Sequence, residues 1–158
     1  METNHKDETG TGRDVASFVL QLPSELNIIE PAVTYLVGRC RAFSFEGSRL
    51  NLNFRLGVTE ALANAVLYGN QSDPAKIVRV EVVLDPSRIV LDVMDEGQGF
   101  DPSSVPDPTL PGNLEGTGGR GLFLIRKLMD EVEYNDAGNA VRLVLLREAS
   151  HGTDSAPE

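Results

Sequence analysis

The stretch Met94-Asp95-Glu96-Gly97-Gln98-Gly99-Phe100-Asp101 decides how the rest of the chain is interpreted. An alternating apolar run leads into Asp95, and two glycines follow that carboxylate. Glycine adopts positive φ angles and allows other groups to approach the backbone closely, so a strand that ends at Asp95 can turn sharply there. The stretch predicts a strand end that presents a carboxylate beside a tightly turned backbone.

A second glycine cluster, Gly116 to Gly121, precedes an apolar helical segment over residues 122–129. The N-terminus of a helix exposes unpaired N–H groups and the positive end of the helix dipole, which together bind anions such as phosphate. Residues 103–114, between the two glycine clusters, show little regular pattern. A carboxylate at one end and a phosphate cradle at the other predict a nucleotide bound between them.

The helix predicted over residues 49–68 places Glu60 and Asn64 on one face, because they lie four residues apart. Asn53, Gly57 and Tyr68 extend this face. Asparagine and glycine cost up to about 1 kcal/mol each relative to alanine inside a helix, so their presence needs a reason. One reason is a solvated polar face. The other is chemical, because Mg²⁺ accepts an amide oxygen together with phosphate oxygens, and a carboxylate one turn away can take a proton.

Upstream of the first glycine pair, the pattern predicts one strand and two helices. Alternation over residues 16–22 predicts a half-buried strand, and Pro31 suits the first turn of a helix that runs to about residue 43. The helix over residues 49–68 has an apolar stripe, and Gly69-Asn70 is predicted to close it as a C-cap.

Two pairs of short alternating runs predict antiparallel hairpins. The first pair covers residues 78–84 and 89–93, and the second covers residues 132–134 and 141–146. The helices are grouped with these hairpins and do not alternate with single strands, which is typical of an α+β protein. We therefore predict a two-layer α/β sandwich with a mostly antiparallel sheet and helices on one face.

Length and composition predict one domain with two tails. The chain has 158 residues, of which 41% are hydrophobic, which suffices for one compact domain. We expect a disordered N-terminal tail over residues 1–14, a domain over residues 15–147 and a C-terminal tail over residues 148–158. The single cysteine, Cys40, excludes an intramolecular disulfide and fits a reducing compartment. No apolar run approaches membrane-spanning length, so we expect a cytoplasmic protein without membrane contact.

The formal net charge of -10 argues against direct binding of nucleic acid, which relies on clustered Lys and Arg side chains. Two interpretations of the acidity stay open. It can serve solubility, or it can form an acidic docking face for a basic partner.

Three elements occur in order along the chain: Glu60 with Asn64, Asp95-x-Gly97-x-Gly99, and Gly119-Arg120-Gly121. This arrangement resembles the N box, G1 box and G2 box of the Bergerat, or GHKL, ATP-binding fold that gyrase, histidine kinases and related ATPases share. Within that superfamily, the chain is similar to the bacterial anti-sigma factor serine kinases of the sporulation and general-stress type. The resembling segment runs from about residue 16 to residue 146.

The resemblance implies roles for the first two elements. Glu60 would be the general base, and Asn64 would bind both the nucleotide and its Mg²⁺ ion. Asp95 would accept a hydrogen bond from the adenine amino group. Gly97 and Gly99 would shape the adenine pocket.

The resemblance also implies roles at the phosphate end. Residues 101–118 would form a lid over ATP. The phosphate contacts would come from Gly119, Arg120 and Gly121.

The sequence departs from the family pattern in two places. Tyr68 stands where the family commonly has histidine, and Gly118 stands where it commonly has serine. The second difference removes a hydroxyl group that could contact phosphate.

Other nucleotide motifs fit less well. Gly116-x-Gly118-x-x-Gly121 also matches a dinucleotide-binding fingerprint, but that motif must directly follow a strand, and a proline-rich loop precedes it here. A Gly-Lys-Ser/Thr loop is absent from the sequence. The only histidines, His5 and His151, lie in the expected tails, which argues against autophosphorylation on histidine.

The resemblance implies a serine/threonine-protein kinase that transfers the γ-phosphoryl group of Mg-ATP to a serine of an anti-sigma factor antagonist, a STAS-type protein. It also implies that the protein is a homodimer that sequesters a sigma factor and thereby regulates transcription. The main alternative is an ATP-binding anti-sigma module with little or no kinase activity. A regulator of similar fold that acts on another target is a third possibility.

Overall fold

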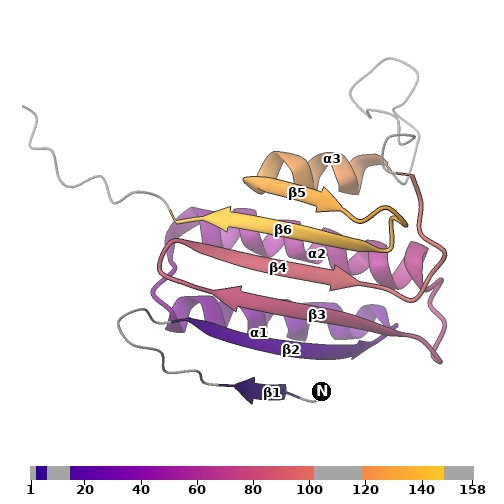
Figure 1. Ribbon diagram of the computed structural model, residues 1–158, viewed down its shortest axis with the longest axis horizontal. Coiled ribbons are helices and arrows are strands. Elements are labelled where there is room, and N and C mark those ends of the chain that lie inside the picture. Colours follow the sequence, from indigo (N-terminus) through magenta and orange to yellow (C-terminus); the bar gives the residue numbers. More distant parts are fainter. Residues whose placement is uncertain (1–2, 7–14, 102–118, 148–158) are drawn as a thin grey trace, which may run out of the picture.

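The computed structural model of the protein describes residues 3–6, 15–101 and 119–147 (Figure 1). In these residues, none of the helices is long and apolar enough to cross a membrane. The strands are β1 (Thr3–Lys6), β2 (Ala16–Pro23), β3 (Ile77–Leu84), β4 (Arg88–Met94), β5 (Glu131–Tyr134) and β6 (Ala140–Leu146). The helices are α1 (Ile29–Ala42), α2 (Arg55–Asn64) and α3 (Gly119–Leu128), with shorter helical turns η1 (Leu26–Ile28), η2 (Arg49–Phe54) and η3 (Ala65–Gly69).

The strands form one sheet in the order β1-β2-β3-β4-β6-β5, and every neighbouring pair is antiparallel. Both predicted hairpins are present, as β3–β4 and β5–β6. They join through β4 and β6, where Met94 lies opposite Ala140. This pairing brings the end of β4, which leads into Asp95, next to the turn between β5 and β6.

The edge strand β1 corrects one expectation. The first 14 residues are predicted above to be a disordered tail, but Thr3–Lys6 pairs with β2 in the structure, with Thr3 opposite Leu20. The prediction is wrong for these four residues, because a short polar segment can add to an exposed sheet edge through its backbone alone. The expected tail over residues 148–158 lies outside the described residues.

The helices cover one face of the sheet, as the predicted two-layer sandwich requires, and Figure 1 shows α1 and α2 behind the strands. The inward positions of β2, β3, β4 and β6 alternate with outward ones and are buried against the apolar stripes of the helices. Fully buried examples are Leu20, Val80, Leu91, Leu36 and Phe54. Burial of each large apolar side chain contributes about 1.5–3 kcal/mol, so this layer is the main source of stability.

The helix predicted over residues 49–68 is continuous through η2, α2 and η3, and its wide turns at both ends are of the π type. Its C-terminus lies where the sequence predicts, with Gly69 as the last residue of η3 and Asn70 as the C-cap residue. Asn70 has right-handed φ and ψ angles of -87° and -5°, and the left-handed residues are the two that follow, Gln71 and Ser72, with φ angles of 51° and 53°. Gly69 and Asn70 also make tertiary contacts that explain their residue types.

Helix α3 lies along α2 in the opposite direction. Asn53 donates a hydrogen bond of 3.0 Å to the carbonyl of Leu128 at the end of α3. A Cβ atom on Gly57 would lie 3.0 Å from the sulfur of Met129, just after α3, so a larger residue there would require the Met129 side chain to shift. The Asn53 and Gly57 positions on the helix face thus contact the C-terminal end of α3.

Candidate functional site

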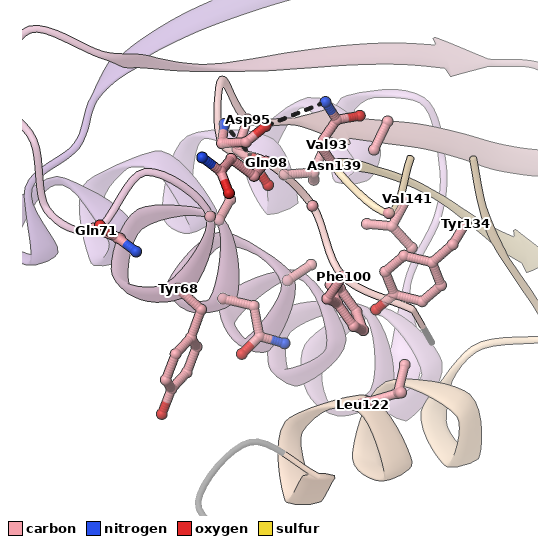
Figure 2. Close-up of a pocket in the computed structure, with 18 of the residues that line it drawn as sticks. Tyr68, Gln71, Val93, Asp95, Gln98, Phe100, Leu122, Tyr134, Asn139 and Val141 are labelled. Carbon is pink, nitrogen blue, oxygen red and sulfur yellow. Dashed lines mark hydrogen bonds between the residues drawn. The ribbon is translucent and has the colours of Figure 1, made fainter. Parts of the chain in front are cut away.

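A cavity of about 580 Å³ lies among the end of α2 and η3, the end of β4, the end of β5 and start of β6, and the start of α3. In Figure 2, Tyr68 and Gln71 lie on one side of the cavity, Phe100 and Tyr134 lie on the other, and Asp95 lies between them. Two of the three predicted elements, Glu60 with Asn64 and Asp95-x-Gly97-x-Gly99, contribute residues to the wall, and Gly121 of the third does not line it. The predicted site residues that line it are Asn64, Asp95, Gly97 and Gly99.

Asp95 is half-buried and packs against Gly69 at the end of η3. A Cβ atom on Gly69 would lie 2.3 Å from Oδ2 of Asp95, and one on Gly97 would lie 2.0 Å from the carbonyl oxygen of Gly69. Both positions therefore require glycine. The backbone N–H of Gly97 donates a hydrogen bond of 2.8 Å to Oδ1 of Asp95. Among the described residues, Oδ2 accepts no hydrogen bond, so it can accept one from a ligand.

Burial raises the pKa of the Asp95 carboxyl above its ordinary value, because desolvation disfavours the charged form. The Gly97 N–H and the charge of Lys76, which also lines the cavity, act in the opposite direction on this pKa. A partly desolvated carboxylate with one free oxygen is suited to bind a hydrogen-bond donor such as an exocyclic amine.

The loop after Asp95 interlocks with the turn between β5 and β6. Gly99 and Gly138 have φ angles of 77° and 73°, in the left-handed region that favours glycine. A Cβ atom on Gly99 would lie 1.7 Å from the carbonyl oxygen of Ala137, and one on Gly138 would lie 1.7 Å from that of Phe100. Each glycine thus leaves room for a backbone carbonyl of the other segment. The close contact with Ala137 explains why Gly99, the second glycine of the G1 box, has no side chain.

An aromatic pair closes the side of the cavity next to α3. The rings of Phe100 and Tyr134 meet edge to face with centroids 5.3 Å apart, as Figure 2 shows, and Leu122 of α3 lies nearby. Burial raises the pKa of Tyr134 to about 12, so its hydroxyl stays protonated at neutral pH. Phe100 and Tyr134 give the cavity an apolar wall that can contact a flat ring.

Glu60 and Asn64 face the start of α3. A Cβ atom on Gly121 would lie 3.0 Å from Oε2 of Glu60 and 3.3 Å from the amide atoms of Asn64. Glu60 does not line the cavity itself but lies one turn before Asn64, which does. The first turn of α3 consists of Gly119, Arg120 and Gly121, so the helix begins beside the Glu60–Asn64 pair. The predicted lid beyond Asp101 lies outside the described residues, as does Gly118.

Several residues of this cavity were not predicted from the sequence. Lys76, Tyr134, Gly138 and Asn139 all line it, and none was singled out. The Asn-Asp-Ala-Gly-Asn turn before β6 carried a turn signal, but its contact with the loop after Asp95 joins segments that are distant in the sequence. Tyr68 is 55% exposed at the cavity wall.

Comparison with known proteins agrees with this geometry. The histidine kinase-like ATPase domain family matches residues 22–145. The chain is 35% identical over 79 residues to "Anti-sigma F factor" of Bacillus cytotoxicus, covering 48% of this chain and 53% of the relative. It is 34% identical over 94 residues to the protein of that name from Geobacillus thermodenitrificans, covering 58% and 64%.

The chain thus spans between about half and two thirds of the length of these curated relatives, at 53% and 64%. The relatives and the domain match confirm the resemblance to GHKL proteins and to anti-sigma factors. An ATPase domain implies a binding site for ATP, and the cavity beside Asp95 is the place that the geometry offers for it. Because the family profile covers most of the sequence, from the end of β2 to the end of β6, the chain belongs to the histidine kinase-like ATPase domain family.

Proposed function

We propose that this protein is an anti-sigma factor serine/threonine-protein kinase. It transfers the γ-phosphoryl group of ATP to a serine of an anti-sigma factor antagonist, and it sequesters a sigma factor in the cytoplasm as a homodimer. The observation that carries the proposal is the juxtaposition of Glu60 and Asn64 with Gly121 at the start of α3. Nucleotide binding alone has no need for a carboxylate at that place.

The adenine end of ATP is assigned to Asp95. Its Oδ2 atom accepts the hydrogen bond of the exocyclic amine, while Oδ1 is held by the N–H of Gly97. The glycines that surround Asp95 leave no room for side chains, so they shape the pocket around the base. The aromatic pair Phe100 and Tyr134 supplies an apolar wall.

The phosphate end is assigned to the first turn of α3, where Gly119, Arg120 and Gly121 provide backbone N–H groups and the positive end of the helix dipole. Glu60 accepts the proton of the attacking serine hydroxyl as general base. Positioning of the two reactants and compensation of charge supply most of the rate enhancement in phosphoryl transfer.

Asn64 is the residue assigned to Mg²⁺. The described residues contain no group of three or more His, Cys, Asp or Glu side chains that could hold a metal by themselves. Mg²⁺ commonly takes one or two protein ligands, substrate phosphates and several waters, so one amide oxygen on the cavity wall fits a metal that arrives with the nucleotide. When bound, Mg²⁺ neutralises charge on the phosphate oxygens.

The assignment of a sigma factor as partner is supported by the relatives named "Anti-sigma F factor". The antagonist as phosphoryl acceptor and the homodimer come from the family resemblance. Competition between the two partners would give a switch, because phosphorylation of the antagonist releases it and leaves the kinase free to capture the sigma factor.

A phosphotransfer assay with γ-labelled ATP, Mg²⁺ and candidate antagonists from the same genome tests the proposal. We expect label on a serine of one antagonist. Glu60→Gln should keep its ATP affinity and lose transfer by about 100-fold or more, the usual contribution of a general base. Glu30→Gln, on the exposed face of α1, is the matched control and should transfer normally.

Phosphoryl transfer by Glu60→Gln at the wild-type rate would show that Glu60 is not the general base. Tight ATP binding without transfer to any candidate would instead favour the alternative function, an ATP-binding anti-sigma module with little or no kinase activity. Sedimentation of the purified protein at several concentrations tests the homodimer separately.

A further inference from the structure

Asn70 is a buried polar residue that directly follows η3, and no role in nucleotide binding follows from the family motifs. Its side chain is 0% exposed. Buried amides are expensive unless their hydrogen bonds are satisfied, so the partners of such a group show what it holds in place.

The amide of Asn70 joins three segments of the chain. Its Nδ2 donates hydrogen bonds of 2.9 Å to the hydroxyl of Ser24 and of 2.9 Å to the carbonyl of Ile77. Its Oδ1 accepts a hydrogen bond of 2.7 Å from the backbone N–H of Glu96. Ser24 in turn donates to the carbonyl of Lys76 at 2.6 Å. The end of η3 is thus connected to the turn between β2 and η1, to the start of β3 and to the residue that follows Asp95.

The bond to Glu96 has a direct consequence for the position of Asp95. The N–H of Asp95 donates to the carbonyl of Asn139 at 2.9 Å, and the next N–H along the chain, that of Glu96, donates to Asn70. The backbone is therefore held on both sides of the Asp95 carboxylate. On one side the acceptor is a main-chain carbonyl, and on the other it is the side chain of Asn70.

We propose that Asn70 is a positioning residue that sets the preference of this pocket for adenine over guanine by holding Asp95 in place through the N–H of Glu96. This inference rests on the proposed role of Asp95 in ATP binding. Adenine presents an amino group, which donates to a carboxylate. Guanine presents a carbonyl oxygen at the same position, which a fixed carboxylate repels. A carboxylate that can move discriminates less between the two bases.

The test measures dissociation constants for ATP and GTP, with Mg²⁺, in the wild type and in variants at two buried positions. Asn70→Ala and Asn70→Ser both remove the acceptor that holds Glu96. We expect either one to reduce the ATP-over-GTP preference by about tenfold, the effect of losing one well-placed hydrogen bond. Asn70→Asp keeps an acceptor for Glu96 and should retain the preference, although it loses both donated bonds.

Ser24→Ala is the matched control, because Ser24 is 2% exposed and belongs to the same network but does not contact Glu96. It should lower the melting temperature and leave the preference unchanged within about twofold. Circular dichroism identifies the variants that are folded. An unchanged preference in folded Asn70→Ala or Asn70→Ser, or a lost preference in Asn70→Asp, overturns the inference.

The outcome also separates this inference from the proposed function. If the wild type binds neither nucleotide, the proposed function fails before any variant is compared. If the wild type prefers ATP and the Asn70 variants keep that preference, only the role of Asn70 is refuted. An equal loss of preference in Ser24→Ala would show that general loosening of the network, and not the bond to Glu96, controls the base preference.

Discussion

Gly69→Ala is the change whose effect on ATP binding follows most directly from the structure. The added Cβ atom would lie 2.3 Å from Oδ2 of Asp95, whereas such atoms are essentially never closer than 3.0 Å. The carboxylate must therefore move by at least about 0.7 Å, the difference between these two distances. A displacement of that size stretches a hydrogen bond of about 2.9 Å to about 3.6 Å, which is no longer a hydrogen bond.

The expected loss can be estimated from the bond that is broken. A hydrogen bond to a charged group contributes about 1.5–3 kcal/mol, and about 1.4 kcal/mol changes an affinity tenfold, so the dissociation constant for ATP should rise about 10- to 100-fold. Inorganic triphosphate lacks the base and should bind the variant as it binds the wild type. Isothermal titration calorimetry with both ligands measures the two effects on the same protein.

Gly38→Ala is the matched control for this experiment, because a Cβ atom on Gly38 would meet nothing within 4 Å. Gly38 lies inside α1, so alanine there should raise the free energy of unfolding by about 0.5–1 kcal/mol and leave ATP affinity unchanged. If Gly69→Ala is folded and binds ATP as tightly as the wild type, Asp95 does not contact the base in the way described. An equal loss for ATP and triphosphate would point to a general disruption of the cavity.

Three further predictions concern single side chains. Burial raises the pKa of the Asp95 carboxyl, so its ionisation lowers the stability of the folded protein as the pH rises from the ordinary pKa through the raised one. Asp95→Asn should therefore have a slightly higher melting temperature than the wild type at neutral pH, but not at acidic pH. It should also weaken the binding of ATP far more than the binding of triphosphate. Arg147 donates to the carbonyls of Ser44 and Phe43 at 2.7 and 3.0 Å, so Arg147→Ala should lower the free energy of unfolding in urea by about 2 kcal/mol, and Arg147→Lys by less. Burial raises the pKa of Cys40 to about 12, so a thiol reagent should modify it only after denaturant is added, and rapid labelling of the native protein would contradict its burial.

The layers of the fold were predictable because they depend on local periodicity. The buried positions of α2, such as Val58 and Leu62, recur with helical spacing, and the alternation in β3 and β4 is unbroken. The sheet order was not predictable in the same way. Nothing local to β6 indicates that it pairs with β4 as well as with β5, and the four residues of β1 have no apolar pattern at all.

Only part of the cavity wall was predicted from the sequence, and the structural reasons for several of its residues were not. The order of Glu60, Asn64 and Asp95 indicated a nucleotide site, and the structure brings Asn64 and Asp95 to one cavity with Glu60 beside it. The glycine and asparagine after Tyr68 were interpreted as a helix cap. In the structure, Gly69 makes room for Asp95, and Asn70 holds the residue after it.

The sequence by itself thus determined the helices, the hairpins and the family boxes, because residue type and spacing act within one segment. The reasons why particular positions require a small residue or a buried amide became visible only in the tertiary structure. Gly99 and Gly138 each lie against a backbone carbonyl of the other's segment, and Asn70 binds an N–H group 26 residues away. A sequence shows that a position lacks a side chain or carries an amide, but the atom that fills the space or accepts the bond belongs to a segment that only folding brings near.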